Sequence, residues 1–369
     1  MLQASNIPQS ILIIRLGAMG DLVHAASAIQ VLKQAHPELA IDWLTTPFYK
    51  PLLEAFRYRH EASGELLPLF RSVFCYDKSE NNAWRKALDD IRKRRYDALV
   101  NLHPSFKTRL LSFLSGAVKH ATYQKQKLSI QGEGQRELPR RHAVSDFLQP
   151  VLALYPDLAT SINATFLETH WPPVLAVSEL DSAKAPSLKK PYIALIIGVG
   201  GKRANRGWPL ENFEALITLI LAKTELAVVL VGGPEEKASA ASLEKALRGA
   251  VSVETNPRLH NLCDKLSLLE TASLLQGASL VLGGDTGPLH LASCFDVPII
   301  ALFGPTSIKR TGALGPETKR LHLLPDENLA CWPCEQPTCH LPADQHLACM
   351  HENAPEAVFK ALAAKLSEG

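Results

Sequence analysis

Two segments of the sequence combine glycines with a carboxylate directly after a short apolar run. Each is expected to form the turn from a strand into a helix, and we call these two turns corners. The first is Arg15-Leu16-Gly17-Ala18-Met19-Gly20-Asp21, which follows the apolar residues 11–14. Glycines there let backbone approach a ligand, and the start of a following helix favours negative charge. The spacing is not GxGxxG, so the dinucleotide fingerprint is absent. Asp21 is either a helix N-cap or a ligand-facing group, because open α/β sheets bind ligands at the carboxyl ends of their strands.

The second corner is Gly283-Gly284-Asp285-Thr286-Gly287-Pro288-Leu289-His290, after the apolar residues 280–282. Asp-Thr-Gly opens a helical pattern, and the free N–H groups of that helix and the Thr286 hydroxyl could hold a diphosphate. The alternative is a capped helix in which the glycines only allow tight packing. His290 lies about one turn into the helix and faces either the core or a ligand.

Between residues 85 and 141, lysine and arginine outnumber aspartate and glutamate, which predicts a local positive field that could attract an anionic partner. Solvated helix faces are the alternative, above all for 92–95. Lys107 follows His103-Pro104-Ser105-Phe106 at a strand end and should come near the corner of Asp21. The basic residues are Arg85, Lys86, Arg92, Lys93, Arg94, Arg95, Lys107, Arg109, Lys119, Lys125, Lys127, Arg136, Arg140 and Arg141.

Four cysteines gather near the C-terminus. Cys331-Trp332-Pro333-Cys334 is half of a zinc-ribbon pattern, but Cys339 and Cys349 are too widely spaced to form the second half. A structural zinc site, reduced thiols and disulfides remain three alternatives for these residues.

The elements that position these residues alternate between short apolar runs and helical patterns, which predicts an α/β fold with parallel sheets. The rhythm stops in a Pro-, Ser- and Lys-rich stretch at 171–190 and then restarts. We therefore expect one domain over 1–175 and a second over 176–350. A last helical pattern lies in 351–369, where the helix could pack back on the N-terminal domain.

The composition describes an ordinary globular protein. With 369 residues, 46% hydrophobic content and a formal net charge of +2, the chain can bury two cores and is too near neutral for a nucleic-acid binder. No run of about 18 apolar residues and no secretory segment occurs, so we expect a cytoplasmic protein.

At this point the chain resembles the ADP-heptose:lipopolysaccharide heptosyltransferases of glycosyltransferase family 9. The resemblance implies a GT-B fold, two Rossmann-like domains facing a central cleft, with acceptor on the first and donor on the second. It implies an inverting, metal-independent transfer of heptose from ADP-heptose to the lipopolysaccharide inner core, either Kdo-lipid A or a core heptose. The residues that carry it are 15–21, Arg206-Gly207-Trp208-Pro209, 284–290 and Phe303-Gly304-Pro305-Thr306.

The resemblance also assigns residues. Asp21 matches the catalytic base, and Arg206 stands where the family commonly has lysine. Glu236 matches the residue that binds the ribose hydroxyls, or is a solvated glutamate at a helix start. Lys265 and Leu266 border the adenine, unless Ser267 merely caps a helix. The expected donor-binding set is Lys202, Arg206, Glu236, Lys265, Leu266, Asp285, Thr286, Gly287 and His290, and the acceptor-binding set is Met19, Gly20, His103 and Lys107.

We expect the enzyme to need neither a cofactor nor a catalytic metal; the ADP-sugar is its donor substrate. The expected partners are that donor, an anionic glycolipid or oligosaccharide acceptor, and the cytoplasmic face of the inner membrane as a peripheral contact. A family 9 enzyme with another nucleotide sugar or acceptor is the first alternative. A catalytically silent binding protein for sugar nucleotides is the second.

Overall fold

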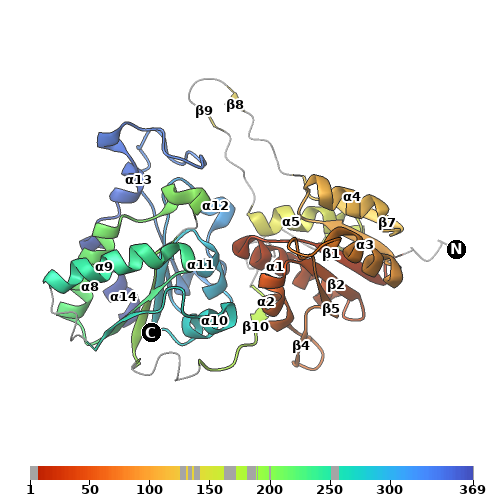
Figure 1. Cartoon of the computed structure of the whole chain (residues 1–369), viewed down its shortest axis with the longest axis horizontal. Helices are drawn as coiled ribbons and strands as arrows, with labels where there is room; N and C mark the ends of the chain where they lie inside the picture. The colour runs from red at the N-terminus through yellow and green to blue at the C-terminus, as the bar shows by residue number, and fades with distance from the viewer. Residues whose placement is uncertain are drawn as a thin grey trace. The chain divides into compact units, whose positions relative to one another are not determined.

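The chain divides into two compact units, residues 1–176 and 177–369. Figure 1 shows the computed structural model of the chain. It describes residues 7–124, 130–131, 135–136, 142–161, 172–180, 188, 190–198, 201–250 and 257–368.

The first unit is built on a five-stranded parallel sheet in the order β5-β2-β1-β6-β7. Its central strand β1 has four consecutive aliphatic residues with no exposed surface, because helices cover both faces of a parallel sheet. The strands of this sheet are β1 (Ser10–Ile14), β2 (Ala40–Thr45), β5 (Ser72–Cys75), β6 (Ala98–Asn101) and β7 (Lys119–Thr122).

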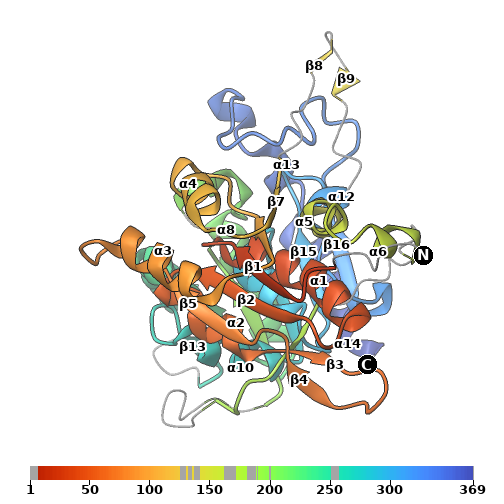
Figure 2. The ribbon, with the colours of Figure 1, turned by 90° about the vertical axis from the view of Figure 1, so that its right-hand side faces the viewer.

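Two pairs of helices cover this sheet. Helix α1 packs against α5, while α3 and α4 lie next to each other and pack their apolar residues on β1 and β6. Figure 2 shows α3 and α4 side by side. The helices are α1 (Met19–Ala35), α2 (Lys50–Ala55), α3 (Ala83–Arg94), α4 (Phe106–Leu114), α5 (Ala143–Leu152) and α6 (Pro156–Ser161), with the 3₁₀ turn η1 (Pro47–Tyr49).

Smaller strands complete the first unit. β3 (Phe56–Arg59) pairs antiparallel with β4 (Leu66–Pro68) and with β10 (Val174–Leu175). β8 (Ile130–Gln131) and β9 (Gln135–Arg136) form a separate hairpin.

The second unit has a six-stranded parallel sheet in the order β13-β12-β11-β14-β15-β16. Helices α8, α9 and α14 lie together on one side of it, and α10 and α11 on the other (Figure 1). The strands are β11 (Tyr192–Ile196), β12 (Ala227–Val231), β13 (Leu259–Asn261), β14 (Leu280–Gly284), β15 (Ile299–Leu302) and β16 (Arg320–Leu323).

The helical segments of the second unit alternate with these strands. They are η2 (Gly201–Arg206), α8 (Leu210–Lys223), η3 (Pro234–Glu236), α9 (Lys237–Ala250), α10 (Leu268–Gln276), α11 (Gly287–Ala292), α12 (Ile308–Thr311), η5 (Glu317–Lys319), η6 (Ala343–Gln345), α13 (Ala348–His351) and α14 (Pro355–Ser367).

The predicted α/β class with two Rossmann-like sheets is confirmed. In both sheets the strand order reverses beside the first strand, between β1 and β6 and between β11 and β14. Ligands of open α/β sheets bind at such switch points, beyond the carboxyl ends of the strands. Both glycine corners of the sequence lie there.

The last helix is part of the second unit. Val358 and Leu362 of α14 are fully buried in the core of the second unit, and α14 packs against α8. The helix therefore belongs to the core of the second unit. Among the described residues, no helix is both long and apolar enough to span a bilayer.

Candidate functional site

The corner after β1 turns more sharply than its sequence indicates, because α1 begins at Met19. Gly17 has a φ of 152°, and a Cβ atom placed on it would lie 2.9 Å from Cε2 of Tyr49. Only glycine fits this approach of backbone to a ring. Asp21 then falls in the first turn of α1, while Ala18 is the N-cap, so the alternative of Asp21 as an N-cap is wrong.

Asp21 is held by an ion pair with Arg15, whose NH2 group donates to Oδ2. The Arg15 side chain is nearly buried, donates to the carbonyl of Leu102, and lies 5.0 Å from the ring centroid of Phe147. Asp21 is 44% exposed, and no hydrogen bond from the described residues reaches its Oδ1. One carboxylate oxygen is thus anchored while the other remains available to a substrate.

Two further polar rings border this corner. His103 follows β6, and burial, followed by the nearby charge of Arg15, lowers its pKa, although a hydrogen bond to the Gly17 backbone opposes this. Burial raises the pKa of Tyr49, which also accepts a hydrogen bond from the Met19 backbone. At neutral pH both rings are therefore uncharged hydrogen-bonding groups beside Asp21.

His103 was predicted from the sequence, whereas Tyr49 and the pairing of Arg15 with Asp21 were not. The available signals were an arginine directly after a buried strand and an aromatic residue in the turn η1 that follows the neighbouring strand β2. Lys107 lies in the first turn of α4, which Ser105 caps, and its side chain is exposed. Met19 and Gly20 begin α1, so the expected acceptor residues all follow the ends of β1 and β6.

In the second unit, Asp285 is the centre of a buried polar network at the end of β14. Its side chain is 2% exposed. Its Oδ2 lies 2.8 Å from NH1 of Arg206, and its Oδ1 lies 3.0 Å from Nε2 of His290. The Thr311 hydroxyl donates to Oδ2 at 3.1 Å. This network fixes Arg206 and His290 beside the start of α11.

Burial of Asp285 acts to raise its pKa, but the hydrogen bond from His290 and the charge of Arg206 outweigh burial, so the pKa lies well below its usual value. Asp285 is thus a permanent anion that positions a cation. From the sequence, Asp285 was expected to bind the donor. The contacts show that it holds Arg206 and His290 in place.

Thr286 lies beside this network with an unused polar atom. It is 7% exposed and is the N-cap of α11, yet its hydroxyl makes no cap hydrogen bond and is buried without a partner among the described residues. A buried hydroxyl in a native protein is nearly always satisfied by protein, water or ligand. Together with the backbone N–H of Gly287, it offers donors to an anion next to Arg206.

Glu236 reaches across the ends of β11 and β12. A Cβ atom on Gly198 would collide with the Glu236 side chain, so only glycine is accommodated there. The Gly233 N–H donates to Glu236 Oε2 at 2.8 Å. Cys263 lies close by, and burial, with the charge of Glu236 adding to it, raises its pKa to about 12. Glu236 is therefore a positioned carboxylate one strand away from the switch point.

The remaining residues that the sequence predicts to bind the donor, Lys202 apart, follow β13. Lys265 is exposed, and its ammonium donates to the carbonyl of Asn261 at 2.7 Å. Leu266 is half-buried. Ser267 caps α10 and forms a capping box with Glu270, as the cap alternative predicted. The side chain of Lys202 lies outside the described residues.

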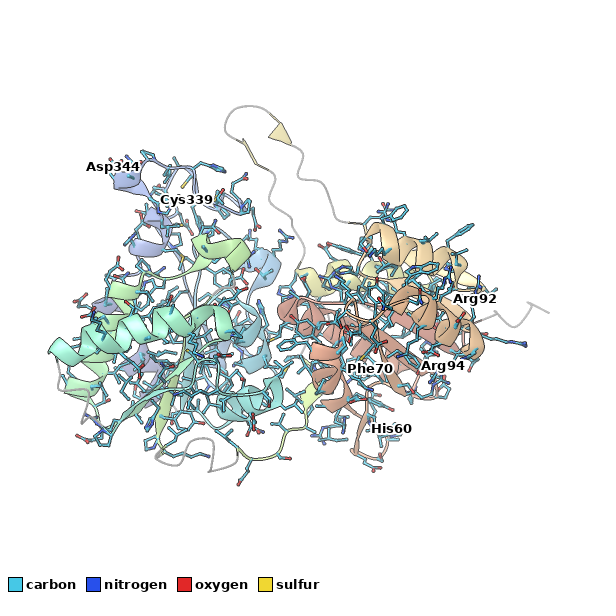
Figure 3. The ribbon with its side chains drawn as sticks, viewed as in Figure 1. His60, Phe70, Arg92, Arg94, Cys339 and Asp344 are labelled. Atoms are coloured by element: carbon cyan, nitrogen blue, oxygen red, sulfur yellow. The ribbon has the colours of Figure 1, made fainter. Side chains whose placement is uncertain are left out.

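The four C-terminal cysteines are close enough to influence one another. Burial, with the charges of Cys334, Cys331 and Cys339 adding to it, raises the pKa of Cys349 to about 12. All four are free thiols in the structure. Nowhere in the described ranges do three His, Cys, Asp or Glu side chains come together as metal ligands. Figure 3 labels Cys339 in this segment.

Known proteins are similar to this chain across both of its units. The sequence model of glycosyltransferase family 9 (heptosyltransferase) matches residues 84–342. Lipopolysaccharide heptosyltransferase 1 of Salmonella typhimurium is 27% identical over 330 residues, which cover 87% of this chain and 96% of the relative.

Two solved structures share the fold over nearly the whole chain. Escherichia coli ADP-heptose lps heptosyltransferase II has a TM-score of 0.71 at 21% identity, covering 97% of this chain and 99% of that one. E. coli heptosyltransferase WaaC with ADP has a TM-score of 0.61 at 19% identity, covering 96% and 99%.

Proposed function

This chain belongs to glycosyltransferase family 9, and we propose that it transfers a heptose from ADP-heptose to the inner core of lipopolysaccharide, to Kdo-lipid A or a core heptose. The observation that carries the proposal is the division of polar groups between the two switch points. The first has a fixed carboxylate with one available oxygen, and the second has a fixed arginine beside an unsatisfied hydroxyl.

We assign the donor to the second unit. The diphosphate of an ADP-sugar needs N–H, O–H and guanidinium donors, and Arg206, Thr286 and the start of α11 supply these. Glu236 then lies where a carboxylate could accept hydrogen bonds from ribose hydroxyls, and Lys265 and Leu266 border the adenine. The ADP bound by the related WaaC supports this choice of nucleotide.

We assign the base to Asp21 in the first unit. In an inverting transfer the acceptor hydroxyl oxygen forms a bond to the anomeric carbon while the bond to the diphosphate breaks. The hydroxyl proton passes to the base, and ADP leaves with the electron pair of the broken bond. Oδ1 of Asp21 is available for that proton, while Arg15 keeps the carboxylate in place.

The departing diphosphate gains negative charge, which Arg206 and the N–H groups at the start of α11 stabilise electrostatically. His103 and Tyr49, both uncharged, can orient an acceptor hydroxyl, and Lys107 can meet an acidic group of the acceptor. Because Kdo-lipid A is lipid-anchored, we place the reaction at the cytoplasmic face of the inner membrane.

Mass spectrometry of the products tests the proposal. The purified full chain is incubated with ADP-heptose, UDP-glucose or GDP-mannose, each with Kdo-lipid A and with a heptosylated core acceptor. We expect a gain of one heptose from ADP-heptose only. Transfer from another nucleotide sugar would make the chain a family 9 enzyme of different donor specificity. Binding of ADP without transfer to any acceptor would favour a silent binding protein.

A further inference from the structure

Helix α4 presents an apolar stripe to solvent. Phe106 is 82% exposed, Phe113 81% and Leu110 37%. At about 100° per residue these three positions fall within an arc of about 60° on one face of the helix. Val118, just beyond α4, is 79% exposed. Large side chains so exposed on one surface are uncommon and mark an interaction site.

The orientation of α4 is fixed by its opposite face. Thr108, Leu111 and Ser112 are buried against the sheet, and the Asn101 side chain donates to the Ser112 hydroxyl at 3.1 Å. Ser105 caps the first turn through a capping box with Thr108. The phenylalanines therefore cannot turn inward without breaking these contacts, and their exposure is a property of the folded unit.

Cations border the stripe. Lys107 and Arg109 are exposed and flank it on the two sides of α4. The end of α3 lies beside α4, and Arg92 donates to the Leu114 carbonyl at 2.8 Å. Lys93 and Arg95 are exposed at the same end of α3, where Asp90 lies 3.8 Å from the Lys93 ammonium. Figure 3 labels Arg92 and Arg94 on α3.

Apolar side chains surrounded by lysine and arginine fit the interface of an anionic bilayer, where rings enter the acyl boundary and cations meet lipid phosphates. Because the cations lie on both sides of the α4 stripe and at the adjoining end of α3, this surface is complementary in charge to an anionic bilayer. We propose that this surface, Phe106, Leu110, Phe113 and Val118 with their cationic border, docks the protein on an anionic lipid bilayer.

The position of α4 next to the Asp21 corner indicates what docking of this surface would achieve. The helix follows His103, which borders the corner of Asp21, so a docked α4 would hold that corner close to the lipid surface. This purpose rests on the proposed function, because only a lipid-anchored acceptor needs it. Binding to vesicles requires no transfer and can be measured on its own.

The test is co-sedimentation of the purified full chain with vesicles of phosphatidylcholine alone or mixed with phosphatidylglycerol. The apolar variant is Leu110→Ser/Phe113→Ser, and its control is Leu66→Ser, a 41% exposed leucine on β4. The charge variant is Arg92→Glu/Lys93→Glu, and its control is Lys245→Glu on α9, where the lysine is exposed.

We expect wild type and both controls to bind the anionic vesicles and to be released by salt. The apolar variant should lose at least about tenfold in partitioning. The charge variant should lose about fivefold for each cation removed. Both should keep the wild-type circular dichroism and full transfer to a deacylated acceptor, while transfer to acceptor in vesicles falls.

Failure of wild type to bind anionic vesicles, or equal binding by the variants, would overturn the proposal. Sedimentation velocity gives a second outcome that would contradict the proposal. In this outcome wild type self-associates and the apolar variant does not, while the two bind vesicles equally. The α4 face would then be a protein interface. Vesicle binding that depends on α4 without transfer from any donor would leave this inference standing and refute the proposed function.

Discussion

Replacing Asp285 by asparagine should destabilise the second unit strongly. The change keeps the shape of the side chain but removes the charge that holds Arg206, whose side chain is 14% exposed, and replaces one of the two acceptor oxygens with an NH₂ group, which cannot accept from Arg206 or His290. A hydrogen bond to a charged group contributes about 1.5–3 kcal/mol, and breaking a buried ion pair costs about 3–5 kcal/mol. Because asparagine keeps one acceptor oxygen, we expect a loss of about 3 kcal/mol.

Urea unfolding followed by circular dichroism measures this loss. With a slope of about 3 kcal/mol per molar, the expected loss moves the midpoint of the affected transition down by about 1 M. The transition of the first unit is an internal reference, because Asp285 lies in the second.

Asp264→Asn is the matched control. Asp264 is an aspartate of the same unit that pairs with Lys237 at 3.2 Å on the surface, and its loss should cost less than about 1 kcal/mol. Equal midpoints for Asp285→Asn and Asp264→Asn would refute the reasoning that the buried network stabilises the unit.

Three further outcomes are expected, for the pH dependence of stability, for acceptor binding and for metal removal. Because the pKa of Asp285 is depressed in the folded state, its stabilisation is complete above the unfolded value of about 4 and is lost as pH falls below it, so urea midpoints of wild type should fall more steeply there than those of Asp285→Asn. Charge reversal of the exposed Lys107 should weaken acceptor binding in titrations at low salt, with a smaller loss at high salt, whereas an equal loss at both would exclude a screened charge. Transfer should persist in excess chelator, since Arg206 and the N–H groups of α11 can supply the positive field, and recovery only with added magnesium would contradict this.

Much of the fold could be predicted from the sequence because the parallel strands are buried on both faces. Residues 11–14 and 280–282 are continuous apolar runs, and the glycine corners that follow them lie at the switch points, as expected. The alternative of Asp21 as the N-cap placed the start of α1 too late, because the true N-cap, Ala18, has no capping side chain that would mark it in the sequence.

The contacts within the site could not be predicted, because they join residues from separate segments. Tyr49 contacts Gly17 from the turn η1 that follows β2, and the Thr311 hydroxyl donates to Asp285 from a helix 26 residues later. Helix α4 is the clearest case. Its apolar spacing alone would predict that Phe106 and Phe113 face the core. Instead, the hydrogen bond from Asn101 to Ser112 and the capping box at Thr108 hold the opposite face of α4 inward.

The central claim is that Asp21 provides the base and the second unit binds the donor nucleotide. The most direct measurement is the turnover number together with the dissociation constant for ADP, determined for Asp21→Asn and Thr286→Val. We predict that Asp21→Asn lowers turnover at least about a hundredfold and leaves ADP affinity within about twofold, while Thr286→Val weakens ADP binding about tenfold. Near-normal turnover of Asp21→Asn, or loss of ADP binding in Asp21→Asn but not in Thr286→Val, would contradict the account.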